Sequence, residues 1–124
     1  MIISNQAEFE GLVRSGRVRL EDAKRKDLSL EGRFDLAYSA SHALALASLR
    51  WQGYRPDRRY ILFQCLEHTL GLDAKVWKVL DLCHTRRNRG EYEGFLDINE
   101  QLVQDLITAT EVVLTEIEKL GPKP

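Results

Sequence analysis

The chain has 124 residues, of which 44% are hydrophobic and 30% are charged, and its formal net charge is -1. A chain of this length forms one ordinary domain with one core, so we expect residues 1–124 to fold as a single unit. The near-zero charge excludes a general electrostatic attraction to nucleic acid or anionic lipid, so polyanion binding would require local clusters of basic side chains.

The amino terminus, MIISNQAEFEG, has no basic lead and no long apolar run, and the apolar segment ALALASL is far shorter than the ~20 residues that span a bilayer. Cys65 and Cys83 fall within expected helices and lack CxxC spacing, so we expect buried free thiols rather than a metal site or disulfide. These features predict a cytoplasmic protein in a reducing compartment, with no membrane contact, no metal and no cofactor.

Helix start and stop signals recur along the chain without sustained strand-like alternation, so the fold is expected to be all-α. Residues 5–8 (NQAE) resemble a capping box that starts a short helix, and Gly16 is expected to end it. A second short helical piece is expected over residues 20–26. Residues 1–28 would then form a helical extension ahead of a bundle at residues 29–121.

The first long helix of the bundle is predicted over residues 30–52, with Ser29 as its N-cap and Gly53 as its stop. Small alanine side chains along it let neighbouring helices approach closely, so this helix is expected at the centre. Apolar and small residues recur at three- or four-residue spacing on its expected core face, namely Leu30, Phe34, Ala37, Ser41, Leu44, Ser48 and Trp51.

Three further helices complete the predicted bundle, over residues 58–70, over about residues 74–89, and after a capping box at residues 97–100 (DINE). Gly71 is expected to stop the first of them and Gly121 the last. Short connections favour antiparallel neighbours, in an up-and-down bundle of four to five main helices plus the short N-terminal helix. The expected core positions are Ile61, Leu62, Cys65, Leu66, Thr69, Val76, Leu80, Cys83, Leu102, Val103, Leu106, Val113, Ile117 and Leu120.

The segment RRNRGEY, residues 86–92, places a polar cluster near the end of the helix predicted at 74–89. Arg87 follows Leu80 and Cys83 on the same inward line of that helix. A buried guanidinium is costly unless it is paired, so it needs a carboxylate such as Glu91, a second subunit or a ligand phosphate. The simpler interpretation is that Arg87 marks the end of the bundle and extends its guanidinium into water.

Two side chains near this cluster, His84 and Tyr92, are candidates for proton transfer. Together with Asn88 they follow one another at four-residue intervals, and Arg87 and Glu91 are also four residues apart. All five therefore share one wedge of helix surface if the helix persists that far. The structural alternatives are that His84 forms a hydrogen bond within the bundle and that Tyr92 packs at its boundary.

The Ala-rich segment FDLAYSASHALALASLRWQGYRP, the segment FQCLEHTLG and the pattern RNxxEY together resemble the HEPN superfamily (higher eukaryotes and prokaryotes nucleotide-binding domain) over about residues 30–120. Many members of that family are metal-independent ribonucleases that act as dimers. Their motif is an Arg, a polar residue and, a few residues later, a His. The resemblance implies a phosphate-binding role for Arg87 with Asn88 beside it, in a site that also includes Arg86, Glu91 and Tyr92.

The chain departs from the family motif at the expected His, because Tyr92 holds that position and no His follows His84. General acid–base catalysis contributes about 10²- to 10⁴-fold, and an unperturbed Tyr is a poor base at neutral pH. We therefore expect a non-catalytic HEPN-like domain that binds nucleotide or RNA phosphate and forms a homodimer.

Two alternative functions follow from the same residues. The first is a metal-independent ribonuclease in which His84 supplies the imidazole. The second is a structural interaction module, for example one half of a toxin–antitoxin pair. Some members of the HEPN superfamily are paired with a nucleotidyltransferase, which the resemblance implies as a partner protein.

Overall fold

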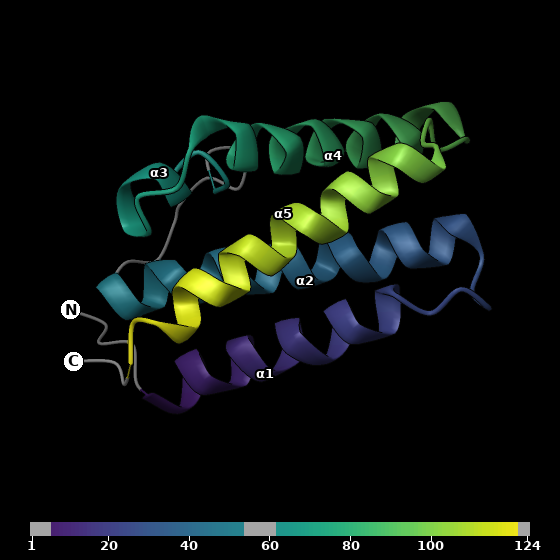
Figure 1. Cartoon of the computed structure of the whole chain (residues 1–124). Helices are drawn as coiled ribbons and strands as arrows, with labels where there is room; N and C mark the ends of the chain where they lie inside the picture. The colour runs from purple at the N-terminus through teal and green to yellow at the C-terminus, as the bar shows by residue number, and fades with distance from the viewer. Residues whose placement is uncertain (1–5, 54–61, 122–124) are drawn as a thin grey trace.

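The computed structural model describes residues 6–53 and 62–121, which contain four long helices and one short one and, within those ranges, no strand (Figure 1). The predicted all-α fold is confirmed. The long helices alternate in direction along the chain, and α2 packs against both α1 and α5. The elements are α1 (Gln6–Ala23), α2 (Leu30–Gln52), α3 (Leu66–Thr69), α4 (Ala74–Glu93) and α5 (Glu100–Glu118).

Helix α1 is one continuous helix, so the prediction of two short pieces separated by Gly16 is wrong. Gly16 is buried inside α1, where a Cβ atom would lie only 2.5 Å from Cγ of Leu44 on α2. The glycine is therefore used for close packing of two helices and not for a left-handed stop. Because Phe9 and Leu20 are buried in the same core as α2 and α5, α1 packs as part of the bundle.

Helix α2 has the predicted bounds and the predicted caps. The Ser29 side chain accepts a hydrogen bond from the Gly32 amide at 3.0 Å, and Gly53 adopts a left-handed conformation with φ of 91°. Phe34 and Leu44 are fully buried, which confirms the predicted core face. The capping residues and the helical periodicity of the sequence both predict α2 correctly. This central helix also forms one wall of the pocket described below.

The region between α2 and α4 differs from the prediction. Helix α3 has only 4 residues, and the chain from 62 to 65 forms turns that nevertheless bury Leu62 and Phe63. The predicted helix start at 58 and the predicted core residue Ile61 lie outside the described residues. Burial of apolar residues in a short segment is compatible with turns as well as with a helix, so the apolar pattern alone did not distinguish them.

Helix α4 continues past Gly90 to Glu93 and ends at Gly94, which has φ of 78°, so the predicted end at residue 89 is wrong. A Cβ atom at Gly90 would lie 3.2 Å from both the Leu96 side chain and the Phe95 carbonyl oxygen. The absence of a side chain at Gly90 therefore lets the returning chain pack closely against α4.

Helix α5 starts two residues later than the DINE capping box predicts. Its N-cap is Asn99, whose side chain accepts a hydrogen bond from the Leu102 amide at 2.8 Å. Asp97 is instead held by Arg86, whose Nη1 donates to the Asp97 carbonyl oxygen at 2.7 Å. The same Nη1 lies 3.3 Å from Oδ2 of Asp97. This contact fastens the turn between α4 and α5.

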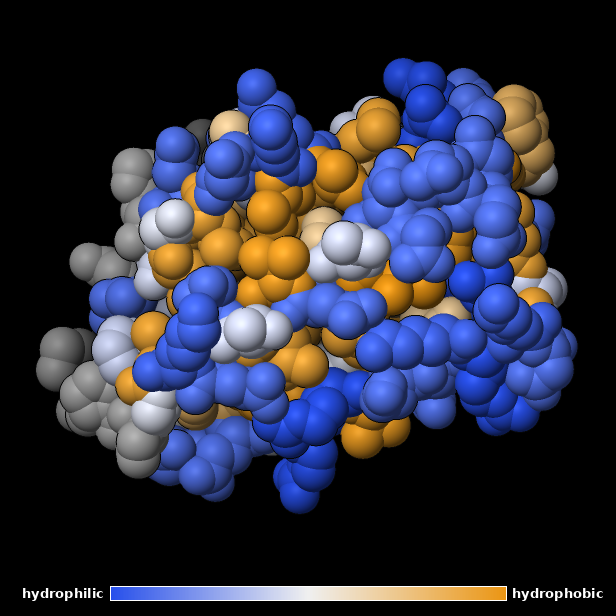
Figure 2. Space-filling view, viewed as in Figure 1, coloured by the Kyte–Doolittle hydropathy of each residue, from blue (hydrophilic) through white to orange (hydrophobic). Residues whose placement is uncertain are grey.

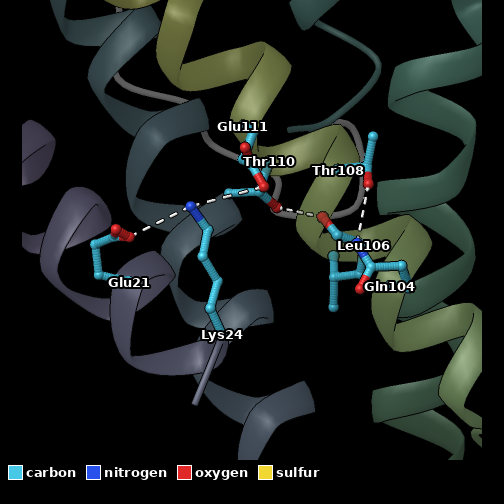
Figure 3. Close-up of polar contacts among 7 residues, drawn as sticks. All are labelled: Glu21, Lys24, Gln104, Leu106, Thr108, Thr110 and Glu111. Atoms are coloured by element: carbon cyan, nitrogen blue, oxygen red, sulfur yellow. Dashed lines mark hydrogen bonds and ion pairs between the residues drawn. The ribbon is translucent and has the colours of Figure 1, made fainter. Parts of the chain in front are cut away.

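Polar contacts link α1 to α5 on the side of the bundle that Figure 3 shows in close-up. Lys24 lies between two carboxylates, with Nζ 3.3 Å from Glu21 on α1 and 3.7 Å from Glu111 on α5. The buried Thr110 hydroxyl donates to the Leu106 carbonyl oxygen of its own helix at 2.7 Å. Each of these polar groups thus has a partner within the bundle.

The surface on the side of α4 and α5 has hydrophobic residues gathered in its middle and hydrophilic residues over much of the rest (Figure 2). This distribution is typical of amphipathic helices around one core. Within the described residues, no helix combines the length and apolar character needed to cross a bilayer.

Candidate functional site

A pocket of about 590 Å³ lies among α1, α2 and α4. Helix α2 supplies half of the lining residues, α4 contributes part of the polar cluster predicted from the sequence, and α1 contributes the remaining two. The lining residues are Leu12, Arg19, Tyr38, Ser39, His42, Ala43, Leu46, His84, Arg87 and Asn88.

The pocket lining has two guanidinium groups, Arg19 and Arg87, two imidazole groups, His42 and His84, and no carboxylate. Arg19 is exposed, and no carboxylate among the described residues lies within ion-pair distance of it. Local charge in this pocket therefore favours an anion, although the net charge of the whole chain does not.

His84 is held by hydrogen bonds at both ring nitrogens. Its Nδ1 lies 2.6 Å from the Tyr38 hydroxyl, and the Asn88 side-chain amide donates to Nε2 at 3.1 Å. Because Nε2 accepts that bond, Nδ1 of the neutral ring carries the proton and donates it to the Tyr38 oxygen. The expectation that His84 forms a hydrogen bond within the bundle is confirmed.

Arg87 lies at the mouth of the pocket, with its Cζ 5.0 Å from the centre of the Tyr38 ring. Its Nη1 is 3.7 Å from Glu91, the partner that the sequence suggested, and its side chain is 44% exposed. Arg87 is therefore not buried on the inward line of Leu80 and Cys83; its exposure agrees with the simpler interpretation, in which the guanidinium extends into water, and Glu91 is its ion-pair partner. The guanidinium lies on the face of an aromatic ring, which stabilises a cation without placing it inside the core.

A second hollow, of about 400 Å³, lies on the other side of Arg87 and has the opposite electrostatic character. Its lining includes three carboxylates, Glu31, Asp35 and Glu91, with Arg87 as the only basic residue. Arg87 therefore lines both a pocket without carboxylates and an acidic one. The electrostatic potential of the first pocket is the more favourable of the two for an anion, because carboxylates line only the second.

Three predicted site residues do not line the pocket. Arg86 is used to hold Asp97, and Glu91 lines the acidic hollow. Tyr92 is 93% exposed, so it neither faces the pocket nor packs at the boundary of the bundle. Tyr92 stands in the last turn of α4, which continues to Glu93.

Sequence reasoning missed the residues that α1 and α2 contribute, above all Arg19, Tyr38 and His42. A signal was present on α2, because Tyr38 and His42 are four residues apart and so share one helix face. Their rings are 6.3 Å apart. No local signal connects Arg19 to this pocket, since only the packing of α1 on α2 brings it there.

Neither cysteine supplies a reactive group to the pocket. Both thiols are free, and Cys65 is only partly buried, which corrects the prediction that both are buried. Burial raises the pKa of the Cys83 thiol to about 12, so it stays protonated and is a poor nucleophile. Among the described residues, no group of three or more His, Cys, Asp and Glu side chains is arranged to hold a metal ion.

Comparisons with protein-family models, with curated proteins and with solved structures find no match for this chain. The pocket is therefore the basis on which a function is proposed.

Proposed function

We propose that the pocket binds the phosphate of a nucleotide or short RNA, in a HEPN-like domain that does not cleave RNA efficiently. The observation that supports this most directly is the presence of Arg19 and Arg87 in a lining without carboxylates. A guanidinium offers a planar set of N–H donors that matches two phosphate oxygens at once.

The remaining lining suits the rest of a nucleotide. Leu12, Ala43 and Leu46 supply apolar surface for a base or sugar, while Ser39 and Asn88 supply groups that form hydrogen bonds. Small-molecule sites commonly combine an apolar wall with a few polar groups that set orientation.

The Arg87–Glu91 ion pair is suited to exchange for a ligand. Its N–O distance is 3.7 Å, and the two side chains are 44% and 64% exposed. Exposed pairs of this kind contribute about 0–1 kcal/mol, so an incoming phosphate would displace Glu91 at little cost.

Replacing Arg87 or Arg19 with Ala is expected to weaken the binding of ATP and of a short single-stranded RNA by about tenfold or more, because each change removes charged hydrogen bonds to phosphate. Titration calorimetry at fixed low salt would measure this. Matched controls are Arg89→Ala on α4, which lies outside the pocket lining, and Arg17→Ala on α1, which pairs with Glu118 on another face.

The controls should bind like the wild-type protein. The proposal fails if neither ligand binds the wild-type protein, or if the pocket variants and the control variants change affinity equally. Weaker binding at higher salt would accompany a genuine phosphate contact, because binding releases counterions.

A second candidate function is RNA cleavage with His84 as the general base. It is favoured by one observation, the position of His84 beside Arg87 in the same pocket. Rotation of the exposed Asn88 side chain would uncover Nε2, which already accepts a hydrogen bond, for the proton of a ribose 2′-hydroxyl.

Incubation of the protein with end-labelled RNA in the presence of a metal chelator tests this candidate. Cleavage should fall by about 10²-fold or more in His84→Ala while RNA binding persists. Cleavage no greater than that of a mock preparation would eliminate the ribonuclease and leave the binding proposal in place. The nucleotidyltransferase partner and the toxin–antitoxin role that the resemblance implies stay predictions.

A further inference from the structure

The hydrogen-bond donors of the pocket come from two helices. Arg19 belongs to α1, whereas His84 and Arg87 belong to α4, and each of these helices packs against α2. An anion in the pocket can therefore receive donors from more than one helix. A phosphomonoester has three terminal oxygens and about two negative charges to match such donors, whereas an internal phosphodiester has fewer free oxygens and a single charge.

The imidazole of His84 is held in place by aromatic side chains. Its Nδ1 donates to the Tyr38 hydroxyl at 2.6 Å, and the two rings are stacked with their centres 6.1 Å apart. Phe63 packs edge to face against the imidazole, with the ring centres also 6.1 Å apart. These contacts fix the ring so that Nε2 is the nitrogen next to Asn88, a residue that lines the pocket.

The Asn88 side chain covers Nε2 of His84 while the pocket holds no anion. Its amide group donates to Nε2 at 3.1 Å, and Asn88 is exposed. Rotation of this amide uncovers Nε2 at little cost, because water replaces the lost hydrogen bond. A protonated imidazole donates from both nitrogens, so Nε2 can then bind an anion while Nδ1 keeps its hydrogen bond to Tyr38.

The charged and titratable groups around His84 favour this protonation when a dianion is bound. They are Arg87 on the same helix, Tyr38 and His42 on α2 and Arg19 on α1, and the lining includes no carboxylate. A dianion among these groups attracts a proton to the imidazole, because opposite charges at short range stabilise each other. Binding of the proton and binding of the phosphate then strengthen each other, and this coupling is reciprocal.

We propose that the pocket prefers a nucleotide with a terminal phosphomonoester, either a nucleoside monophosphate or the 5′-phosphate end of an RNA, and that His84 takes up a proton when this dianion binds. The inference rests on the proposed phosphate-binding function and adds the chemical class of the phosphate. Nε2 of His84 donates to one phosphate oxygen, and the guanidinium groups of Arg19 and Arg87 bind the others. A phosphodiester has one negative charge and therefore gains less from the added proton.

Titration calorimetry with AMP and with the diester-linked dinucleotide ApA separates the two classes of phosphate. At about pH 7.5 a phosphomonoester, with a second pKa of about 6, is already a dianion. AMP is expected to bind at least about tenfold more tightly than ApA, because charged hydrogen bonds are the stronger ones. His84→Gln keeps a neutral donor but cannot carry the charge, so it should weaken AMP binding about tenfold and ApA binding less than about threefold.

Proton uptake is a second measurement, which a purely structural role of His84 would not affect. Titrations of AMP into the wild-type protein at about pH 7.5, in buffers of different ionisation enthalpy, should show uptake of up to about one proton per AMP. ApA should cause less uptake, and AMP should cause none in His84→Gln. AMP affinity should also fall as the pH rises further, because a neutral imidazole becomes harder to protonate.

Two RNA tetranucleotides of one sequence, with a 5′-phosphate and with a 5′-hydroxyl, distinguish the two sources of the phosphomonoester. Tighter binding of the phosphorylated oligomer would support an RNA end as the ligand, and equal binding of the two, together with the preference for AMP, would support a mononucleotide. Arg89→Ala, outside the pocket lining, is the control and should keep both the AMP affinity and the proton uptake.

Three results would overturn the inference: equal affinity of the wild-type protein for AMP and ApA, loss of both affinities by the same factor in His84→Gln, or proton uptake that persists in this variant. If neither AMP nor ApA binds the wild-type protein, the phosphate-binding proposal itself fails. Circular dichroism would show whether His84→Gln is folded. If it is not, absence of proton uptake by the wild-type protein would still refute the role of His84.

Discussion

Replacing Arg33 with Met is expected to lower the free energy of unfolding by about 2–3 kcal/mol, since it breaks a buried charged contact that joins three helices. Arg33 is 7% exposed. Its Nε donates to the Ala23 carbonyl oxygen of α1 at 3.1 Å, and Nη1 donates to Glu100 on α5 at 2.9 Å. Met replaces most of the apolar part of the Arg33 side chain. The decrease in unfolding free energy therefore measures mainly the loss of the hydrogen bonds.

The Ala23 carbonyl oxygen accounts for most of this expected loss. Ala23 is fully buried, so its carbonyl oxygen would be left without a donor and with poor access to water. The Glu100 side chain is 71% exposed and can return to solvent. Glu100→Gln, which keeps the size of the side chain, is therefore expected to cost less than about 1 kcal/mol.

Denaturation in urea, followed by circular dichroism, would compare Arg33→Met with Glu100→Gln. Equal losses in the two variants would show that the ion pair to α5, and not the bond to the end of α1, stabilises this corner. A loss below about 0.5 kcal/mol for Arg33→Met would contradict the expectation.

Gly16→Ala is expected to lower the free energy of unfolding by about 1–3 kcal/mol, although alanine favours helix formation more than glycine does. The added Cβ would lie 2.5 Å from Cγ and 2.6 Å from Cδ2 of Leu44, and Leu44 is fully buried in the core. Overpacking of the α1–α2 contact thus outweighs the gain in helix propensity.

Gly11→Ala provides the matched control on the same helix. A Cβ at Gly11 meets nothing within 4 Å, so this variant should gain about 0.5–1 kcal/mol from the reduced freedom of its unfolded chain. Thermal unfolding at low protein concentration would measure both variants as monomers. If the two glycine variants changed stability in the same direction, the close contact between Gly16 and Leu44 would not determine the effect of Gly16→Ala.

A double variant isolates the contact itself. Leu44→Ala alone should cost about 2–5 kcal/mol, because it leaves a cavity in the core. In the double variant, the methyl group that Gly16→Ala adds occupies part of that cavity. The double variant should therefore lose less stability than the sum of the two single losses. Simple additivity would contradict direct packing of Gly16 against Leu44.

Local chemistry accounts for the features that the sequence predicted well. The Ser29 cap, the Gly53 stop and the core face of α2 depend on residues within a few positions of one another, and all three agree with the structure. The position of His84, Arg87 and Asn88 on one side of a helix is likewise a local property of helical spacing. These three residues do line one pocket.

The roles of the glycines depended on contacts distant in sequence. Gly53 and Gly94 end helices in the left-handed conformation, whereas Gly16 and Gly90 lie inside helices. Gly16 is close to Leu44 and Gly90 is close to Leu96, so the neighbouring chain determines which role each glycine takes. Sequence context within one helix does not contain that information.

The sequence by itself determined the helical fold, the limits of the central helix and a polar cluster on α4 that suits an anion. Tertiary structure alone decided which side chains line the pocket with that cluster, because Arg19 and Tyr38 reach the pocket only when α1 and α2 pack beside α4. It also decided that Arg87 lies over the Tyr38 ring and not in the core, and that Tyr92 projects from the bundle. The physical reason is that helical periodicity acts within one segment, whereas a pocket forms where side chains from several segments meet.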